Sequence, residues 1–184
     1  MAYTRTPIAD VPAYDLDAAK LHARIDDYYD DSETTLIAAT AVAEVEAYAD
    51  IALLAQTVTA TLEGCAPRTA LPVGPLWGDG LEDHPIAVQA RDCNGELTDV
   101  NSGWWVEQGR FPVIHFSQAV TANTIIVTYP AGYGQMVADI PADIQLAVND
   151  HASRLYDLRG PADAPQGLSL AAARIMARHR RVRV

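Results

Sequence analysis

The spacing of apolar residues changes near residue 56, and this change limits the folds that the chain can adopt. Between residues 33 and 54 apolar residues recur every three or four positions, which predicts one buried face of a helix. They are Ile37, Ala41, Val45, Tyr48 and Ala52. From Gln56 to Glu63 apolar and polar residues alternate instead, as in a strand with one buried face. A helix followed directly by a strand is therefore expected.

A second boundary, from strand to helix, lies in residues 124–158. β-branched and aromatic residues predict a strand at 124–129, ended by Pro130, and two glycines then allow the chain to turn. An amphipathic helix follows at 140–158 with Asp139 available as its cap. His151 lies on the apolar face of this helix, where a histidine of the core or of an interface is the expected interpretation.

These boundaries predict an α+β fold: a helical core that contains an inserted antiparallel β-sheet and is followed by an extended C-terminal tail. The core consists of two N-terminal helices, at about 15–25 and 33–54, and the long C-terminal helix at 140–158; the sheet occupies about 56–129. Asp15 can cap the first helix. Residues 1–13 are expected to be irregular because two prolines interrupt them.

The chain divides by charge into an acidic body and a basic end. Residues 1–153 hold six Lys and Arg against twenty-two Asp and Glu, whereas residues 154–184 hold seven Arg against two Asp. We therefore predict one folded domain at 1–160 and a linker with a basic tail at 161–184, in which a short helix can form at 168–178. Such a difference between parts of one chain is typical of an interaction segment.

The sequence contains no arrangement typical of catalysis or of cofactor binding. Its five histidines are scattered without metal-ligand spacing, and neither phosphate-binding glycine motif is present. Cys65 and Cys93 follow no metal pattern; free thiols are expected, and a disulfide between them stays open. No run of 18 apolar residues occurs, so a membrane segment is not expected. We predict a protein without cofactor or metal that is not an enzyme.

Two other function classes stay open. The three tryptophans, Trp77, Trp104 and Trp105, suit a carbohydrate-binding module or a hydrolase that stacks on sugars. The basic end suits nucleic-acid binding, although acidic protein surfaces attract arginines equally well.

Several short motifs, in their order along the chain, resemble the head-to-tail connector (adaptor) family of tailed bacteriophages, prophages and gene transfer agents. The N-terminal motifs are Leu16-x-x-Ala19-Lys20-x-His22-x-Arg24-Ile25-Asp26-Asp27 and Val45-Glu46-x-Tyr48. The middle ones are Leu71-Pro72-x-Gly74-Pro75-Leu76 and Asp92-Cys93-Asn94-Gly95. The last are Val127-Thr128-Tyr129-x-Ala131-Gly132-Tyr133-Gly134, Ile140-Pro141-x-Asp143-Ile144 and Leu155-Tyr156-x-x-Arg159. The resemblance covers most of residues 14–159, and the residues at 77–84 and 104–110 depart from it.

The resemblance implies a non-enzymatic virion protein, made in the bacterial cytoplasm and located in the neck between capsid and tail. It would form a ring, commonly of twelve copies, under the portal protein, contact the next neck or tail-completion protein, and line a channel that DNA crosses without sequence-specific binding. A stopper or other tail-completion protein is the alternative. The expected portal-binding residues are Arg174, Arg178, His179, Arg180, Arg181, Arg183 and Val184. Candidates for the interface between ring subunits are Tyr48, His151, Arg154, Tyr156 and Arg159.

Overall fold

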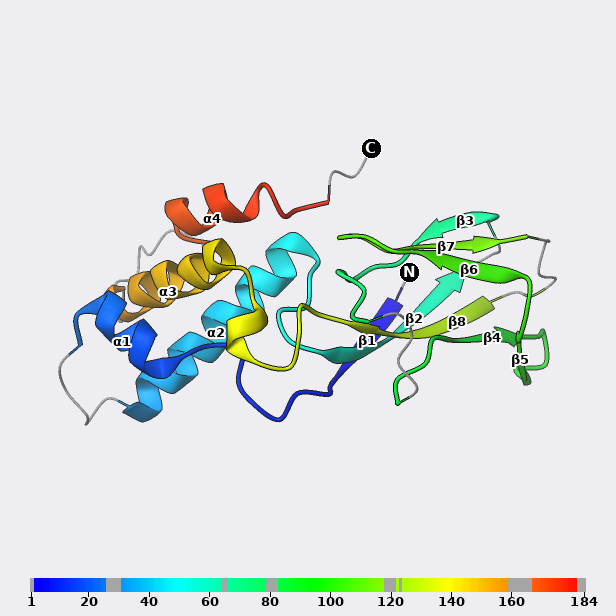
Figure 1. Ribbon diagram of the computed structural model, residues 1–184, viewed down its shortest axis with the longest axis horizontal. Coiled ribbons are helices and arrows are strands. Elements are labelled where there is room, and N and C mark those ends of the chain that lie inside the picture. Colours follow the sequence, from blue (N-terminus) through cyan, green and yellow to red (C-terminus); the bar gives the residue numbers. More distant parts are fainter. Residues whose placement is uncertain are drawn as a thin grey trace. The chain divides into compact units, whose positions relative to one another are not determined.

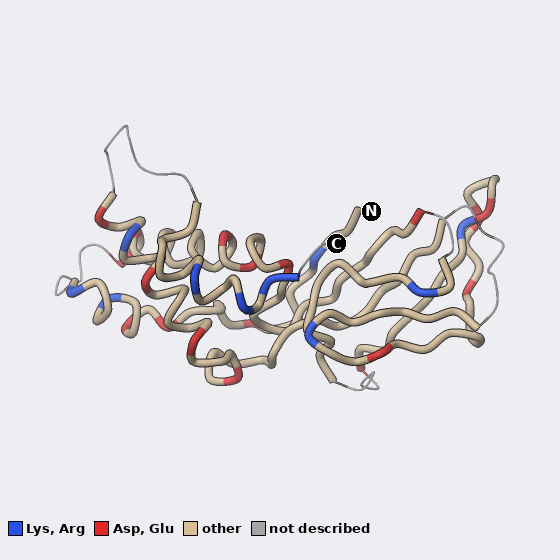
Figure 2. Tube along the Cα trace, turned by 90° about the horizontal axis from the view of Figure 1, so that it is seen from above, with Lys and Arg blue, Asp and Glu red and all other residues tan. Residues whose placement is uncertain are grey.

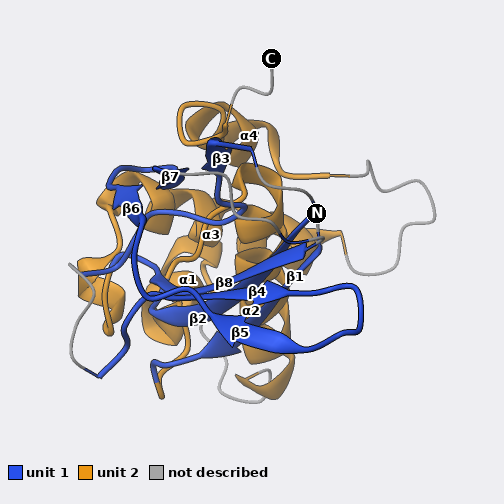
Figure 3. Ribbon diagram, turned by 90° about the vertical axis from the view of Figure 1, so that its right-hand side faces the viewer, with its two compact units in different colours: residues 1–9, 54–133 blue, residues 10–53, 134–184 orange. Residues whose placement is uncertain are grey.

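The computed structural model describes residues 2–25, 31–63, 66–78, 83–117, 122, 124–158 and 167–181. The chain forms two compact units, and each combines separate stretches of sequence (Figure 3). Unit 1 comprises Met1–Ala9 and Leu54–Tyr133, and unit 2 comprises Asp10–Leu53 and Gly134–Val184. Unit 1 contains antiparallel sheets and unit 2 contains helices, so the predicted combination of the two is confirmed.

The strands of unit 1 form two antiparallel sheets, one of which lies over a face of the other (Figures 1 and 3). The larger sheet has the order β1-β2-β8-β4-β5, and the smaller one β3-β7-β6. The bounds are β1 Ala2–Pro7, β2 Gln56–Glu63, β3 Arg68–Ala70, β4 Ala87–Arg91, β5 Leu97–Asp99, β6 Trp104–Glu107, β7 Val113–Phe116 and β8 Thr124–Ala131.

The alternation at residues 56–63 produces the buried face of the larger sheet. In β2, Val58 and Ala60 are fully buried, and they pair with the equally buried Tyr129 and Val127 of β8. Ile114 of β7 contributes to the core from the smaller sheet. Burying one face of each sheet in this way is the main favourable term for unit 1.

Two strand predictions were wrong. The irregular segment expected at the N-terminus contains β1, which pairs along its length with β2 at the edge of the larger sheet. An edge strand tolerates Pro7 because it needs ladder hydrogen bonds on one side only. The strand expected to end before Pro130 continues to Ala131, and Pro130 lies opposite Thr57 in the register.

Tyr129 connects β8 to the loop that follows β3 of the smaller sheet. Its hydroxyl accepts a hydrogen bond from the Val73 N–H at 3.1 Å and donates one to the Val73 carbonyl at 2.9 Å, and both residues are fully buried. Replacing Tyr129 with Phe leaves both backbone groups buried without this partner. We expect the free energy of unfolding of unit 1 to fall by about 1–3 kcal/mol in denaturant titrations.

The same loss of a hydroxyl at Tyr3, which is 40% exposed on β1, provides the control. Tyr3→Phe should change the free energy of unfolding by less than about 0.5 kcal/mol. Equal effects of the two substitutions would mean that the buried hydroxyl of Tyr129 contributes no more than an exposed one.

Unit 2 is built around α3, which contacts each of the other α-helices. The helices are α1 Leu16–Ala23, α2 Asp31–Ala49, η1 Val137–Asp139, α3 Ala142–Asp157 and α4 Leu170–Met176. Asp15 caps α1, as predicted, by accepting hydrogen bonds from the N–H groups of Asp17 and Ala18. The cap predicted for α3 was wrong, because Asp139 belongs to η1, where it accepts from the Met136 N–H, and Pro141 is the N-cap.

The C-terminal part differs from the extended tail that the sequence predicted. Residues 170–176 form α4, so the short helix predicted at 168–178 is present, and it packs on α3 and α2. Ala172, Ile175 and Met176 are buried at helical spacing, and this apolar face explains why the segment folds onto unit 2. The linker at 159–166 and the last three residues lie outside the part of the chain that the structure describes.

Candidate functional site

The basic C-terminal segment, residues 167–181, is attached to the other helices of unit 2 by a polar network at the start of α4. Ser169 is the N-cap of α4, and its hydroxyl oxygen accepts a hydrogen bond from the Ala172 N–H at 3.1 Å. The same hydroxyl donates to a carboxylate oxygen of Asp150 on α3 at 2.5 Å. The Ser169 side chain therefore both starts the helix and attaches it to α3.

His151 connects this N-cap with α2. It is 1% exposed, and its Nδ1 atom accepts a hydrogen bond from the Ser169 N–H at 3.1 Å. Because that N–H can only donate, the ring hydrogen must lie on Nε2, which donates to a Glu44 carboxylate oxygen at 2.7 Å. His151 thus joins α2, α3 and α4 and has no exposed surface to offer a neighbouring subunit.

The other end of the segment is attached by His179. This side chain is 7% exposed, and its Nε2 atom lies 2.7 Å from a carboxylate oxygen of Asp143 in the first turn of α3. Its Nδ1 atom is buried without a hydrogen-bond partner among the described residues. The hydrogen bond from His179 lowers the pKa of the Asp143 carboxyl, and the Ile144 N–H and the nearby Arg178 act in the same direction.

The lowered pKa of Asp143 makes the attachment of the segment sensitive to acid. Stability that depends on the carboxylate is fully present above the ordinary aspartate range and is lost as the pH falls through the lowered pKa. We expect the difference in unfolding free energy between wild type and Asp143→Asn to shrink between about pH 5 and about pH 2. Chemical denaturation over this range measures it. Asp17→Asn, in the first turn of α1, controls for removing a charge near a helix start, and an equal pH dependence there would contradict the assignment.

The arginines predicted to contact the portal lie mainly at the surface of unit 2. Arg174, Arg178 and Arg180 are exposed, whereas Arg181 is half-buried. The Arg180 guanidinium lies 5.3 Å from the centre of the Tyr48 ring, a cation–π contact with α2. Figure 2 shows these basic residues along the last described stretch of the chain. Arg183 and Val184 lie outside the described residues, and His179 is buried rather than presented at the surface.

The predicted subunit-interface residues are divided between surface and interior. Tyr48, Arg154 and Tyr156 are half-buried, His151 is buried, and Arg159 lies outside the described residues. Arg154 lines an open hollow of about 550 Å³ beside α3 and α4. No sequence pattern was assigned to Glu44, Asp150 or Ser169, which complete the hydrogen-bond network around His151. For Ser169 a signal was present, since a serine directly before an apolar run is typical of an N-cap.

The three tryptophans of unit 1 have separate neighbours. The Trp104 indole donates to the Val100 carbonyl at 2.6 Å, and Trp77 lies beside His84. Trp105 is 54% exposed and stacks on His115, with ring centres 3.9 Å apart. The His115 ring also contacts Glu107 at 3.1 Å and, with Arg68, lowers the pKa of that carboxyl. Trp105 therefore already has an aromatic partner on one face.

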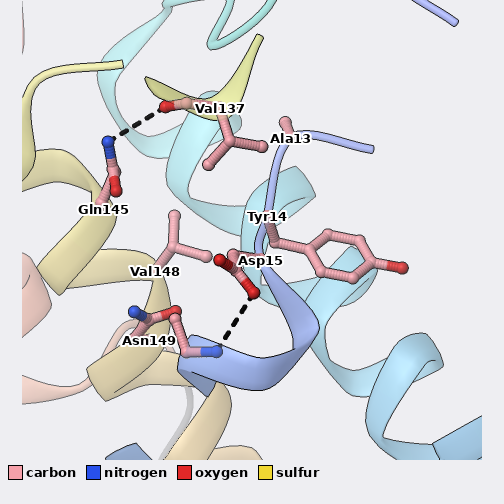
Figure 4. A pocket seen from close by; sticks show the side chains of 8 residues that line it. Ala13, Tyr14, Asp15, Val137, Gln145, Val148 and Asn149 are labelled. Atoms are coloured by element: carbon pink, nitrogen blue, oxygen red, sulfur yellow. Dashed lines mark hydrogen bonds between the residues drawn. The ribbon is translucent and has the colours of Figure 1, made fainter. Parts of the chain in front are cut away.

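A small cavity lies in unit 2 near the start of α1 (Figure 4). Asp15, Val137, Gln145, Val148 and Asn149 are among the residues that line its volume of about 50 Å³. The Gln145 amide donates across its edge to the Val137 carbonyl at 3.0 Å. A space of this size holds water rather than a substrate, since ligand pockets usually measure several hundred Å³.

Among the described residues no group of three or more His, Cys, Asp or Glu side chains could hold a metal ion. None of the helices in the described part of the chain combines the length and the apolar content that a membrane crossing requires. Cys93 is an exposed free thiol, and Cys65 lies outside the described residues.

Comparison with known proteins identifies the fold. The sequence matches no protein-family model and no curated protein. The structure matches a chain from the neck of an empty gene transfer agent particle, computed with C6 symmetry, at TM-score 0.79 and 21% identity. It also matches chains from the virion of a native gene transfer agent particle and from a native neck computed with C12 symmetry, at TM-scores of 0.78 and 0.71 and 21% identity. Each match covers 100% of this chain and 97% of the other, so this chain shares the fold of those chains over its full length.

Proposed function

We propose that this chain is a structural subunit of the neck of a phage-like particle, where it connects the DNA-filled capsid to the tail. The observation that carries the proposal is the extent of the shared fold, which covers 100% of this chain and 97% of a chain from a gene transfer agent neck. A match confined to one unit would have pointed to a common module instead. The resemblance in the order of sequence motifs supports the same proposal.

Within such a neck we propose that identical copies form a closed ring, commonly of twelve, under the portal protein. The structures that share the fold include necks computed with C6 and with C12 symmetry, which supports a repeated subunit. Contacts between two different surfaces of one subunit close into a ring when the rotation between copies fits. The next neck or tail-completion protein would lie on the other side of the ring.

The charge of the chain supports a channel that DNA crosses without being held. Residues 1–153 contain twenty-two Asp and Glu against six Lys and Arg, and an acidic lining repels the phosphate backbone. We therefore propose a structural role without an enzymatic step, without cofactor and without sequence-specific DNA binding. The protein would be made in the bacterial cytoplasm and carried in the particle.

The portal contact is proposed for the end of the basic segment. Arg180 is exposed, and it is followed by Arg181, Arg183 and Val184 at the end of the sequence. Arginines suit an acidic protein surface because each presents several donors in a fixed geometry. His179, which was predicted to take part, would act by holding the segment on unit 2 through Asp143.

Reversing these charges tests the portal contact in the full-length chain. A variant with Arg180→Glu, Arg181→Glu and Arg183→Glu should bind the assembled portal at least about tenfold more weakly, as measured by interferometry. The control reverses three exposed arginines of unit 1, Arg68, Arg91 and Arg110, and should change the affinity less than about twofold. Unchanged binding of the first variant would contradict the contact. Binding of the chain to a tail-completion protein but not to the portal would favour the stopper alternative.

A further inference from the structure

The solvent face of α2 is nearly free of charge over four turns. The exposed residues of α2 are Ser32, Glu33, Thr35, Leu36, Ala39, Thr40, Ala43 and Ala47. Leu36 is 67% exposed, and the Thr40 hydroxyl donates to the Leu36 carbonyl at 2.8 Å, so this hydroxyl is satisfied within the helix. Because the opposite face of α2 is buried as well, this helix is apolar on two sides. A helix of that kind is expected to be covered on both.

The solvent face of α4 carries a second exposed leucine among basic residues. Leu170 is 84% exposed, and Arg174 and Ala177 follow it on the same face at helical spacing. Residues 167–181 contain four arginines and no acidic residue, whereas residues 31–49 contain four acidic residues and no Lys or Arg. The two segments therefore have opposite net charge, although on α2 Asp31 and Glu44 already pair with Lys20 and His151 and Glu33 is the exposed acidic residue beside Leu36.

The two helices that carry these faces lie largely on different sides of α3 (Figures 1 and 3). In Figures 1 and 3, α3 lies between α4 above it and α2 below it, and both helices pack mainly against α3. One face on each side of a subunit is the arrangement that a head-to-tail ring requires, because each copy must offer one surface forward and a different one backward.

The spacing of large and small residues on the two faces matches when the helices run in opposite directions. Leu36 and Ala43 are seven residues apart on α2, and Leu170 and Ala177 are seven residues apart at α4. An antiparallel alignment places Leu170 on Ala43 and Leu36 on Ala177, so each leucine meets a small residue. The same alignment brings Glu33 close to the basic end of α4. A parallel alignment would place leucine on leucine and alanine on alanine.

We propose that α4 of one copy lies antiparallel on the solvent face of α2 of the next copy, and that this contact joins the subunits of the ring. This inference rests on the proposed function and deepens it by naming the interface between subunits. In this arrangement Leu170, Arg174 and Ala177 contact the neighbouring copy, while Arg180 and the residues after it contact the portal.

Cysteine cross-linking between separately prepared copies tests the alignment. Cys65 and Cys93 are first replaced by serine in the full-length chain. One sample then carries only Ala43→Cys and the other only Leu170→Cys; they are mixed, assembled with the portal and oxidised. We expect a covalent dimer in the mixture, because a disulfide needs Cα atoms about 4.4–6.8 Å apart. A mixture of Leu36→Cys and Ala177→Cys should link too, whereas Ala43→Cys with Ala177→Cys should not.

A charged substitution at Leu36 provides an independent readout. Leu36→Glu should lower the amount of chain assembled on the portal at least about tenfold, because it buries a carboxylate against alanine and methyl groups. Leu97→Glu, at a leucine 46% exposed on β5, should leave assembly within about twofold of wild type.

The possible failures are distinguishable. If the wild-type chain assembles with the portal but the mixtures that include Ala43→Cys with Leu170→Cys give no dimer, the interface is wrong and the proposed function stands. Dimers from one single-cysteine sample alone would indicate a symmetric contact and would also overturn the inference. If the wild-type chain neither self-assembles nor binds an assembled portal, both the proposed function and the interface fail.

Discussion

Replacing His151 with alanine should lower the free energy of unfolding of unit 2 by about 3–5 kcal/mol. The side chain is 1% exposed, so its removal leaves a cavity between the helices. It also leaves the buried Ser169 N–H without its acceptor and Glu44 without its donor.

In His151→Ala we expect the C-terminal segment to unfold locally under conditions in which the rest of unit 2 stays folded. Since His151 holds the N-cap of α4, amide hydrogens of α4 should exchange with solvent faster in His151→Ala than those of α2 and α3, as measured by hydrogen exchange and mass spectrometry. His22→Ala, at an exposed histidine of α1, is the matched control and should change the unfolding free energy by less than about 0.5 kcal/mol. A loss below about 1 kcal/mol in His151→Ala, with α4 still protected, would show that the network does not hold the segment.

Gly132→Ala should destabilise unit 1 by about 3–5 kcal/mol or prevent its folding, since it combines backbone strain with a clash. Gly132 follows β8 with φ +139°, and an added Cβ would lie 2.5 Å from the Leu54 carbonyl oxygen and 2.8 Å from the Ala55 N–H nitrogen. Those atoms belong to the backbone next to β2, so they cannot move without moving the strand. Thermal unfolding of purified protein, or the soluble yield where purification fails, measures the effect.

A second glycine is a control that has the backbone strain of a positive φ but not the steric clash of an added Cβ. Gly95 also has a positive φ, +87°, in the turn between β4 and β5, but nothing lies within 4 Å of an added Cβ. Gly95→Ala should therefore cost only about 1 kcal/mol, the strain alone. If Gly132→Ala cost no more than Gly95→Ala, the close approach of residue 132 to Leu54 would not occur in the folded protein.

Local sequence patterns predicted the elements whose formation depends on their own residues. The alternation in β2 and the Asn94-Gly95 turn between β4 and β5 lie where the sequence places them, because period and turn chemistry are local properties. Strand β1 was missed, because its pairing with β2 joins residues 49 to 59 positions apart. Propensity carries no information on such a partner.

The sequence predicted which charged residues the candidate site contains, but not which side chains contact one another. The net charge of the C-terminal segment is evident from the sequence, and Arg174, Arg178 and Arg180 are exposed. The sequence did not show that Glu44 and His151, which are 107 residues apart, form one hydrogen bond. Nor did it show that His179 turns inward to Asp143, because the choice between a tail in solution and a docked helix depends on tertiary packing.

The most direct test of the central claim is light scattering on the full-length chain mixed with the assembled portal protein encoded near it. A subunit of a neck ring should join the portal in one stable complex, with a mass that exceeds the portal by a fixed whole number of chains, about twelve for a ring that matches a twelvefold portal. If the chain instead elutes at its own mass beside an intact portal at every ratio tested, the claim that it connects capsid to tail at the portal is contradicted.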